Sequence, residues 1–480
     1  MAKPKTKTVK KRTGSNTLAK DRSMDTAFLL IVLVLLAFGL IMVFSASYAY
    51  ALNYEGDSFY YIKRQGIFAV LGVIGMLVIS RIDYRLLKKF WVLIYAIGIV
   101  LLVCVFVPGL SVSTDTGVSR WIGIGSLTYQ PSEFAKLAII VSFSALIYKN
   151  YPKIKTFRYG IIPFAILLVP VVVLVYLEPH LSGLIIIVCI AAIMMFVGGV
   201  RLRHMLAVVL AGVILLGSFL LIQSAMGGGE EETTGQAVTT VQAEETASTA
   251  EDGTTSETAD SGTTSQSETT EESSSGGGFF ESYQWRRIQN WLDPFGRSDG
   301  SGYDTDITGD VWQTCQSLLA IGSGGIMGLG LGNSRQKYMY LPEPQNDFIF
   351  AIVCEELGLI GAILVILLFV LLVYRGFVIA NRAPNKFASM LVVGITVQIG
   401  IQALFNIAVV TNAFPNTGIS LPFFSYGGTA LMMQLFEMGV VLNISRHTHV
   451  AKERQDREKK RKHQQLAAEG AGITTIQEQH

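Results

Sequence analysis

The stretch LPEPQNDFIFAIVCEELG, Leu341–Gly358, runs from a polar turn into an apolar segment and takes four carboxylates with it. They are Glu343, Asp347, Glu355 and Glu356. Ionisable side chains within a membrane segment are costly and usually face a partner or a cavity, so each is a candidate functional residue. We predict that Glu343 and Asp347 border a cavity and that Glu355 and Glu356 organise a helix bundle through a buried cation.

The matching cation is Lys136, which falls inside another apolar run. Glu133 precedes it by about one helical turn, and the helix should begin at Pro131. Burying a charge is tolerated when it is paired, so we predict a structural ion pair between Lys136 and Glu355 or Glu356.

A second group in the same region suits an anionic ligand. In GVSRWIGIGSLTYQPSEFAK, Arg120 stands beside Trp121. A guanidinium can clamp a phosphate while an indole anchors at the membrane interface, which together fit an amphipathic headgroup. The alternative is an ordinary interfacial tryptophan.

Residues 283–347 bring carboxylates and cations together in one polar segment. The carboxylates are Asp293, Asp299, Asp304, Asp306 and Asp310, and the cations are Arg286, Arg287, Arg335 and Lys337. Carboxylates can act as a general base or hold a divalent ion, and the cations can bind an anionic group. The segment is therefore a candidate catalytic region.

The composition predicts an all-α polytopic membrane protein, because 50% of the residues are hydrophobic and only 15% are charged. A membrane-spanning helix needs about 20 apolar residues. Ten candidate spans lie near residues 26–46, 66–80, 91–110, 134–149, 159–177, 181–199, 204–223, 348–374, 387–411 and 427–445. The four cysteines show neither a disulfide framework nor metal-ligand spacing.

The distribution of Lys and Arg predicts the orientation, because cytoplasmic segments retain positive charge. Both tails and alternate loops are basic, which places both termini in the cytoplasm and one large extracytoplasmic loop between the seventh and eighth helices. The predicted regions are a basic tail (1–25), helices one to seven (26–223), the loop (224–347), helices eight to ten (348–445) and a second basic tail (446–480). Within the loop, the acidic residues 226–278 should be disordered and residues 279–347 ordered.

Four ordered segments resemble one family. FSASYAYAL, GVSRWIGIGSLTYQPSEFAK, AIGSGGIMGLGLGNSRQKYMYLPEPQNDFIFAIVCEELG and FPNTGISLPFFSYGGTALM are similar to the signature segments of the SEDS family, the FtsW, RodA and SpoVE proteins. The likeness runs from Asp25 to Arg446, apart from the acidic insert. YLPEPQNDFIFAIVCEELG looks closer to the division and sporulation branch than to the elongation branch.

This resemblance implies a plasma-membrane peptidoglycan glycosyltransferase with ten helices and an extracytoplasmic catalytic face, most like the division type. Such an enzyme polymerises lipid II into β-1,4 glycan strands and releases undecaprenyl diphosphate. Inversion at the donor sugar needs one carboxylate as base and some cation for the leaving diphosphate, and a divalent cation, Mg or Mn, is expected. The implied partners are a class B penicillin-binding transpeptidase and other divisome proteins, with membrane lipid and no nucleic acid.

The resemblance leaves the catalytic base open among three aspartates. The register counted back from WQTCQS selects Asp306, the GSGY turn selects Asp299, and the DP pair supplies Asp293 as a third choice. We prefer Asp306. The intervening segment is longer than in the family pattern, and this leaves the assignment open.

Two further segments complete the expected site. LEPHLSG departs from the more usual Q-P-D pattern, so Glu178 or His180 could take over a polar role or be neutral. PNTGISLPFFSYGG is rich in helix breakers and predicts a re-entrant loop whose Thr417, Ser425 and Tyr426 line the substrate site. A purely structural turn is the alternative. The predicted substrate-binding residues are therefore Arg120, Trp121, Arg335, Lys337, Glu343, Asp347, Thr417 and Ser425.

Two other functions compete with the enzyme. A lipid II flippase would use charges at the membrane midplane, here Glu133, Lys136 and Glu355, whereas catalysis needs a carboxylate outside. A non-catalytic scaffold for the transpeptidase would not need Asp306, Arg335 or Lys337. The denser cluster lies in the outer segment, which favours the enzyme.

Overall fold

The structure is a computed structural model that describes residues 24–113, 119–124, 127–178, 180–208, 210, 291–292 and 310–448. The chain divides into two compact units, residues 1–208 with 287–480 and residues 209–286. All the elements below belong to the first unit. The predicted acidic insert, 226–278, and the three candidate catalytic aspartates lie outside the described residues.

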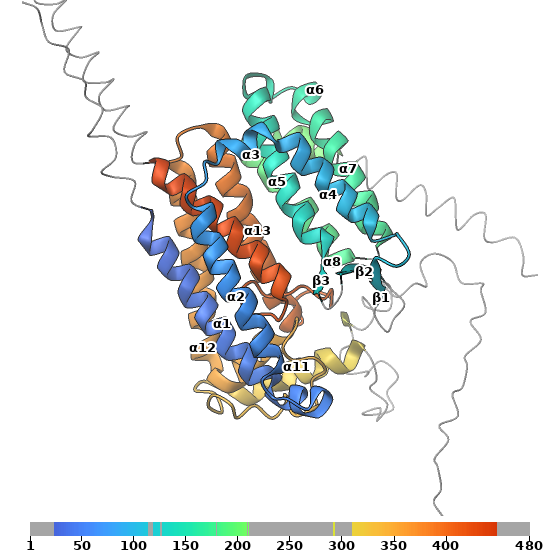
Figure 1. Ribbon diagram of the computed structural model, residues 1–480, viewed down its shortest axis with the longest axis vertical. Helices are drawn as coiled ribbons and strands as arrows, with labels where there is room; N and C mark the ends of the chain where they lie inside the picture. The colour runs from blue at the N-terminus through green and yellow to red at the C-terminus, as the bar shows by residue number, and fades with distance from the viewer. Residues whose placement is uncertain are drawn as a thin grey trace, which may run out of the picture. The chain divides into compact units, whose positions relative to one another are not determined.

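The described part is mostly helical (Figure 1). Its helices are α1 (Thr26–Glu55), α2 (Tyr60–Ile79), α3 (Arg85–Lys89), α4 (Trp91–Cys104), α5 (Pro131–Asn150), η1 (Tyr151–Lys153), α6 (Phe157–Gly160), α7 (Ile162–Leu177), α8 (Leu181–Gly198), α11 (Asp310–Gly324), α12 (Ile349–Asn381) and α13 (Lys386–Val410). The C-terminal helix is Gly428–Thr448.

Eight described helices are long and apolar enough to cross a membrane, and α4, with 14 residues, is a shorter apolar helix. Nine of the ten predicted spans thus coincide with described helices, while most of the seventh, 204–223, lies outside the described residues. The spans predicted at 66–80 and 134–149 were too short, because α2 begins at Tyr60 and α5 at Pro131. Polar residues in the first turns of these helices lower the local hydropathy but are accommodated in the fold. The count of ten stays a prediction.

The prediction of an all-α chain was too narrow. The segment before α5 forms a three-stranded antiparallel sheet of β1 (Ser111–Ser113), β2 (Ser119–Ile124) and β3 (Leu127–Tyr129). β2 is the central strand and pairs Trp121 with Val112 and Ile122 with Tyr129. Its aromatic and β-branched residues favour strands, and a short sheet satisfies backbone groups that a bare loop would leave open.

The helices pack around α5, α13 and the C-terminal helix. In the most apolar segments of these three helices, 83%, 67% and 72% of the residues are buried. α5 contacts α4, α8 and α13, and α12 packs against α1 and α13 (Figure 1). By contrast, only 22% of the residues in the most apolar segment of α2 are buried, and the outer face of this helix presents large apolar side chains. A broad apolar surface of this kind suits contact with lipid.

The loop that follows α11 binds to α12 at a break in that helix. Gly358 has φ 64° and ψ −163°, a conformation reserved for glycine, and a Cβ there would meet the backbone of Ile326 and Gly328. The loop satisfies the backbone groups on both sides of the break: the amide of Leu329 donates to the carbonyl of Glu355, and the amide of Leu359 donates to that of Gly325. The loop is therefore joined to α12 through its backbone.

Candidate functional site

A cavity of about 840 Å³ opens among segments that the sequence predicts to share one side of the membrane. Its charged lining consists of Arg64, Arg120, Lys136, Glu133, Glu343 and Asp347. Trp121, Gln130, His180, Gln402 and Tyr426 add polar and aromatic groups. Cations, carboxylates and aromatic rings thus converge from α2, the sheet, α5, the loop before α12 and the loop before the C-terminal helix.

At the inner part of this cavity, Lys136 pairs with Glu133. The Lys136 Nζ donates to Glu133 Oε1 at 2.8 Å and to Gln402 Oε1 at 3.4 Å. Both charged side chains are less than a tenth exposed. The predicted pairing of Lys136 with Glu355 or Glu356 is wrong, because the i, i+3 spacing on α5 supplies a nearer carboxylate.

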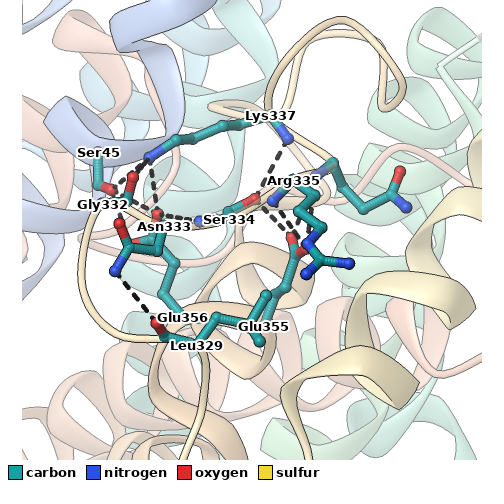
Figure 2. Close-up of polar contacts among 10 residues, drawn as sticks. Ser45, Leu329, Gly332, Asn333, Ser334, Arg335, Lys337, Glu355 and Glu356 are labelled. Carbon is teal, nitrogen blue, oxygen red and sulfur yellow. Dashed lines mark hydrogen bonds and ion pairs between the residues drawn. The ribbon is translucent and has the colours of Figure 1, made fainter.

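Glu356 pairs instead with Lys337, which folds back from the loop before α12 (Figure 2). The Lys337 Nζ lies 3.0 Å from Glu356 Oε1, and the Ser45 hydroxyl of α1 donates to the same carboxylate at 2.7 Å. Glu356 is fully buried and Lys337 is 2% exposed. The prediction of Lys337 as a substrate contact is therefore corrected to a buried structural cation that joins α1, α12 and the loop.

Glu355, the neighbouring carboxylate, holds the same loop through hydrogen-bond donors rather than a cation (Figure 2). It accepts hydrogen bonds from the Ser334 hydroxyl and from the Arg335 amide, the latter at 2.9 Å. Charge-assisted hydrogen bonds to backbone amides stabilise a buried carboxylate. Glu355 and Glu356 do organise the bundle, as expected, but through residues 334–337.

The other predicted site residues divide into two groups. Arg120, Trp121, Glu343 and Asp347 line the cavity. Arg335 is exposed and Thr417 and Ser425 are buried, and none of these three is among its lining residues. The Ser425 hydroxyl accepts from the Leu421 amide, which indicates the structural-turn alternative for this residue. The substrate-binding roles stay predictions.

Arg64 was not predicted as a site residue, but it lines the cavity, and its guanidinium lies 4.3 Å from the centre of the Tyr60 ring. The sequence did contain an indication of this role, because Lys63 and Arg64 lie between the first two predicted spans, in a loop predicted to lie outside. Positive charge is usually found inside. Gln402 was also missed, since a glutamine within an apolar helix gives no indication of which partner it meets.

Two titratable groups between α7 and α8 show how strongly this end of the bundle excludes water. Burial raises the pKa of Glu178 to about 8, with the Arg120 charge partly offsetting it. Burial, together with the positive charges of Arg120 and Lys136, lowers the pKa of His180 to about 3. Neither Glu178 carboxylate oxygen has a hydrogen-bond partner among the described residues. Both groups therefore favour their neutral forms.

Replacing Glu178 with glutamine should remove a pH dependence of stability. In the folded protein the pKa of Glu178 is about 8, above the ordinary glutamate value of 4.5. The contribution of Glu178 to the free energy of unfolding is therefore complete below pH 4.5 and is lost as the pH rises through 8. Above pH 8 the variant should be more stable than wild type by roughly 1–3 kcal/mol, with little difference under acidic conditions. Thermal unfolding followed across pH checks this, and parallel profiles for the two proteins would contradict it.

The FtsW/RodA/SpoVE family, described as cell cycle protein, matches this chain over residues 25–227 and 277–450. The chain belongs to this family. It is 37% identical over 430 residues to the stage V sporulation protein E of Bacillus subtilis, covering 89% of this chain and 99% of that relative. It is 34% identical to the probable peptidoglycan glycosyltransferase FtsW of Trichlorobacter lovleyi, covering 88% and 93%.

Two solved structures share the fold. One, described as the structural coordination of polymerization and crosslinking by a peptidoglycan synthase complex, matches with a TM-score of 0.60 and 22% identity over 89% of this chain and 98% of its own. The rod shape determining protein RodA of Thermus thermophilus matches with a TM-score of 0.55 and 22% identity over 90% and 98%. At these identities the likeness supports the fold.

The described residues of this family member do not themselves offer a metal site. No group of three or more His, Cys, Asp or Glu residues within the described ranges could hold a metal ion. The predicted divalent cation concerns the aspartates at 293–306, outside those ranges, so it stays a prediction. The positive charge that the cavity does contain comes from Arg64, Arg120 and Lys136.

Proposed function

We propose that this chain is a peptidoglycan glycosyltransferase that polymerises lipid II into β-1,4 glycan strands and releases undecaprenyl diphosphate. The observation that carries the proposal is a single cavity in which cations, carboxylates and membrane-facing apolar residues meet. Relatives at 34% identity are named probable peptidoglycan glycosyltransferases, which supports the same assignment.

The cations of the cavity suit the diphosphate of the substrate. Arg64 and Arg120 lie in its wall and Lys136 lies in its inner part. Guanidinium groups bind phosphate oxygens in a fixed fork, whereas the Lys136 ammonium acts as a point charge already shared with Glu133. We propose that Arg64 and Arg120 bind the diphosphate and that the Lys136 ammonium stabilises the negative charge that develops as the diphosphate leaves.

The apolar flank suits the lipid chain. Ile67 and Leu71 of α2 line the cavity and are also 61% and 50% exposed. The cavity wall therefore continues onto the apolar outer face of α2, where bilayer lipid is expected. An amphipathic substrate could place its headgroup among the cations while its isoprenoid chain stays on this face.

The chemistry that we propose is inversion at the donor sugar. A carboxylate takes the proton of the acceptor 4-hydroxyl, that oxygen attacks C1 of the donor, and the bond from C1 to the diphosphate breaks. We assign the base to Asp306, with Asp299 and Asp293 as alternatives, and expect a divalent cation there. Glu343 and Asp347 line the cavity and would orient the sugars.

We further propose that the chain works with a class B penicillin-binding transpeptidase at the outer face of the plasma membrane in septum synthesis. The related solved structure whose description joins polymerization and crosslinking in one complex supports a cross-linking partner. Identity of 37% to a sporulation protein and 34% to an FtsW supports a role in division or sporulation.

Glycan polymerisation from fluorescent lipid II by the purified chain with its transpeptidase partner tests the function. Asp306→Asn should reduce polymer formation by about 10²–10⁴-fold, because general-base catalysis supplies a factor of that size. Asp299→Asn is the matched control and should stay active. Chelation by EDTA should abolish activity that added Mg or Mn restores.

If Asp299→Asn is the inactive variant, the base is reassigned. If wild type forms no polymer yet moves lipid II across liposome membranes, the flippase alternative replaces the enzyme. If neither activity appears while the transpeptidase still binds, the chain is a scaffold.

A further inference from the structure

A buried amide and a buried carboxyl group meet in the interior of the bundle. The Gln398 Nε2 of α13 donates to Glu437 Oε2 of the C-terminal helix at 2.8 Å. Both residues are 1% exposed. The cation that acts electrostatically on Glu437 is Lys136, which also lines the cavity. Glu437 thus belongs to the polar interior that continues from the cavity, although it is not among the lining residues.

The pair leaves two acceptor atoms unused. Glu437 Oε1 and Gln398 Oε1 have no hydrogen-bond partner within the described part of the chain. An ionised carboxylate and an amide oxygen can only accept, so neither can satisfy the other. A carboxylic acid has an O–H donor and can form two hydrogen bonds with an amide, one in each direction. One proton on Glu437 Oε1 would therefore satisfy both atoms.

The surrounding charges favour the same state. Gln398 of α13 contacts Glu437 directly, and the groups that act on it electrostatically are Lys136 and Glu133 of α5 and, before α5, Tyr129. Lys136 is the single cation in this set, and it already pairs with Glu133 at 2.8 Å. An ionised Glu437 would leave one buried negative charge without a cation of its own, which is more costly than taking up a proton.

We propose that Glu437 is a positioning residue that carries a proton at neutral pH, paired with Gln398, so that Lys136 stays with Glu133 beside the cavity. The effect on substrate rests on the proposed function, whereas the protonation does not. If Glu437 were ionised, it would attract Lys136 away from the cavity and add a negative charge near the site of the substrate diphosphate.

Infrared difference spectroscopy of the full chain tests the proton directly. The spectrum of wild type minus Glu437→Gln at neutral pH should contain the C=O band of a carboxylic acid, shifted on exchange into D₂O. Glutamine is the matched replacement because two amides can form the same pair of hydrogen bonds. In Gln398→Leu the acid band should persist at higher wavenumber, because its carbonyl loses the amide donor. Carboxylate bands in place of the acid band would overturn the proposal.

The second measurement separates positioning from a merely structural role. The wild-type KM for lipid II should rise by about tenfold or more as Glu437 ionises at alkaline pH, through charge repulsion. The KM of Glu437→Gln should stay constant over the same range, while kcat follows the same pH profile in both proteins. Parallel KM profiles would overturn the positioning role. An acid band without glycan polymerisation would leave the proton assigned and reject the proposed enzyme.

Discussion

Replacing Lys337 with methionine should lower the free energy of unfolding by about 3–5 kcal/mol, because it leaves a buried carboxylate without its cation. Glu356 is fully buried, and its other donors are neutral, chiefly the Ser45 hydroxyl at 2.7 Å. Methionine keeps an unbranched side chain only one atom shorter than that of lysine, so the expected loss comes mainly from charge rather than from a cavity. The apparent melting temperature of the purified chain in detergent measures it.

An exposed ion pair provides the matched control. Lys63 and Asp57 lie 2.6 Å apart, closer than Lys337 and Glu356, but their side chains are 64% and 43% exposed. Lys63→Met should leave the melting temperature nearly unchanged, since water screens such pairs. Adding Glu356→Gln to Lys337→Met should recover part of the loss. Equal melting temperatures for Lys337→Met and Lys63→Met would show that the buried pair does not hold the loop.

Lys136→Met should reduce kcat/KM for glycan polymerisation by about 10²–10³-fold, because it removes a preorganised cation from the cavity. It should also lower stability, since Glu133 would lose its partner at 2.8 Å. The double variant Glu133→Gln with Lys136→Met separates the two effects, because it removes both buried charges. We expect it to regain thermal stability and to remain inactive in the fluorescent lipid II assay. Recovery of activity as well would make Lys136 a purely structural residue.

The sequence predicted the helices well and the partners of buried charges poorly, for a physical reason. A membrane span is recognised from the local run of apolar residues, which the sequence shows directly. Nine of the ten predicted spans therefore coincide with described helices. Pairing depends on which segments meet in space. Helical spacing was enough to relate Glu133 to Lys136. It could not show that Lys337, from a polar loop, would fold back to reach Glu356.

The cavity shows the same division. Arg120, Trp121, Glu343 and Asp347 were predicted from residue type and motif, and the structure places all four in its lining. Arg64 and Gln402 reach the same cavity from α2 and α13, far apart in sequence, so no local pattern connects them. Glu437 and Gln398 were not recognised either, because a buried hydrogen-bonded pair between two apolar helices has no signature in either helix alone.

The break at Gly358 bears on how α12 enters the membrane. The part after the break, residues 359–381, still exceeds the roughly 20 residues that a span requires. Glu355 and Glu356 lie before the break, where the preceding loop satisfies their side chains and the backbone around them. The apolar part of α12 after Gly358 is therefore long enough to span the hydrocarbon without including either carboxylate. The loop and the first turns of the helix then form one hydrogen-bonded unit at the end of that span, held by the ion pair of Lys337 and Glu356.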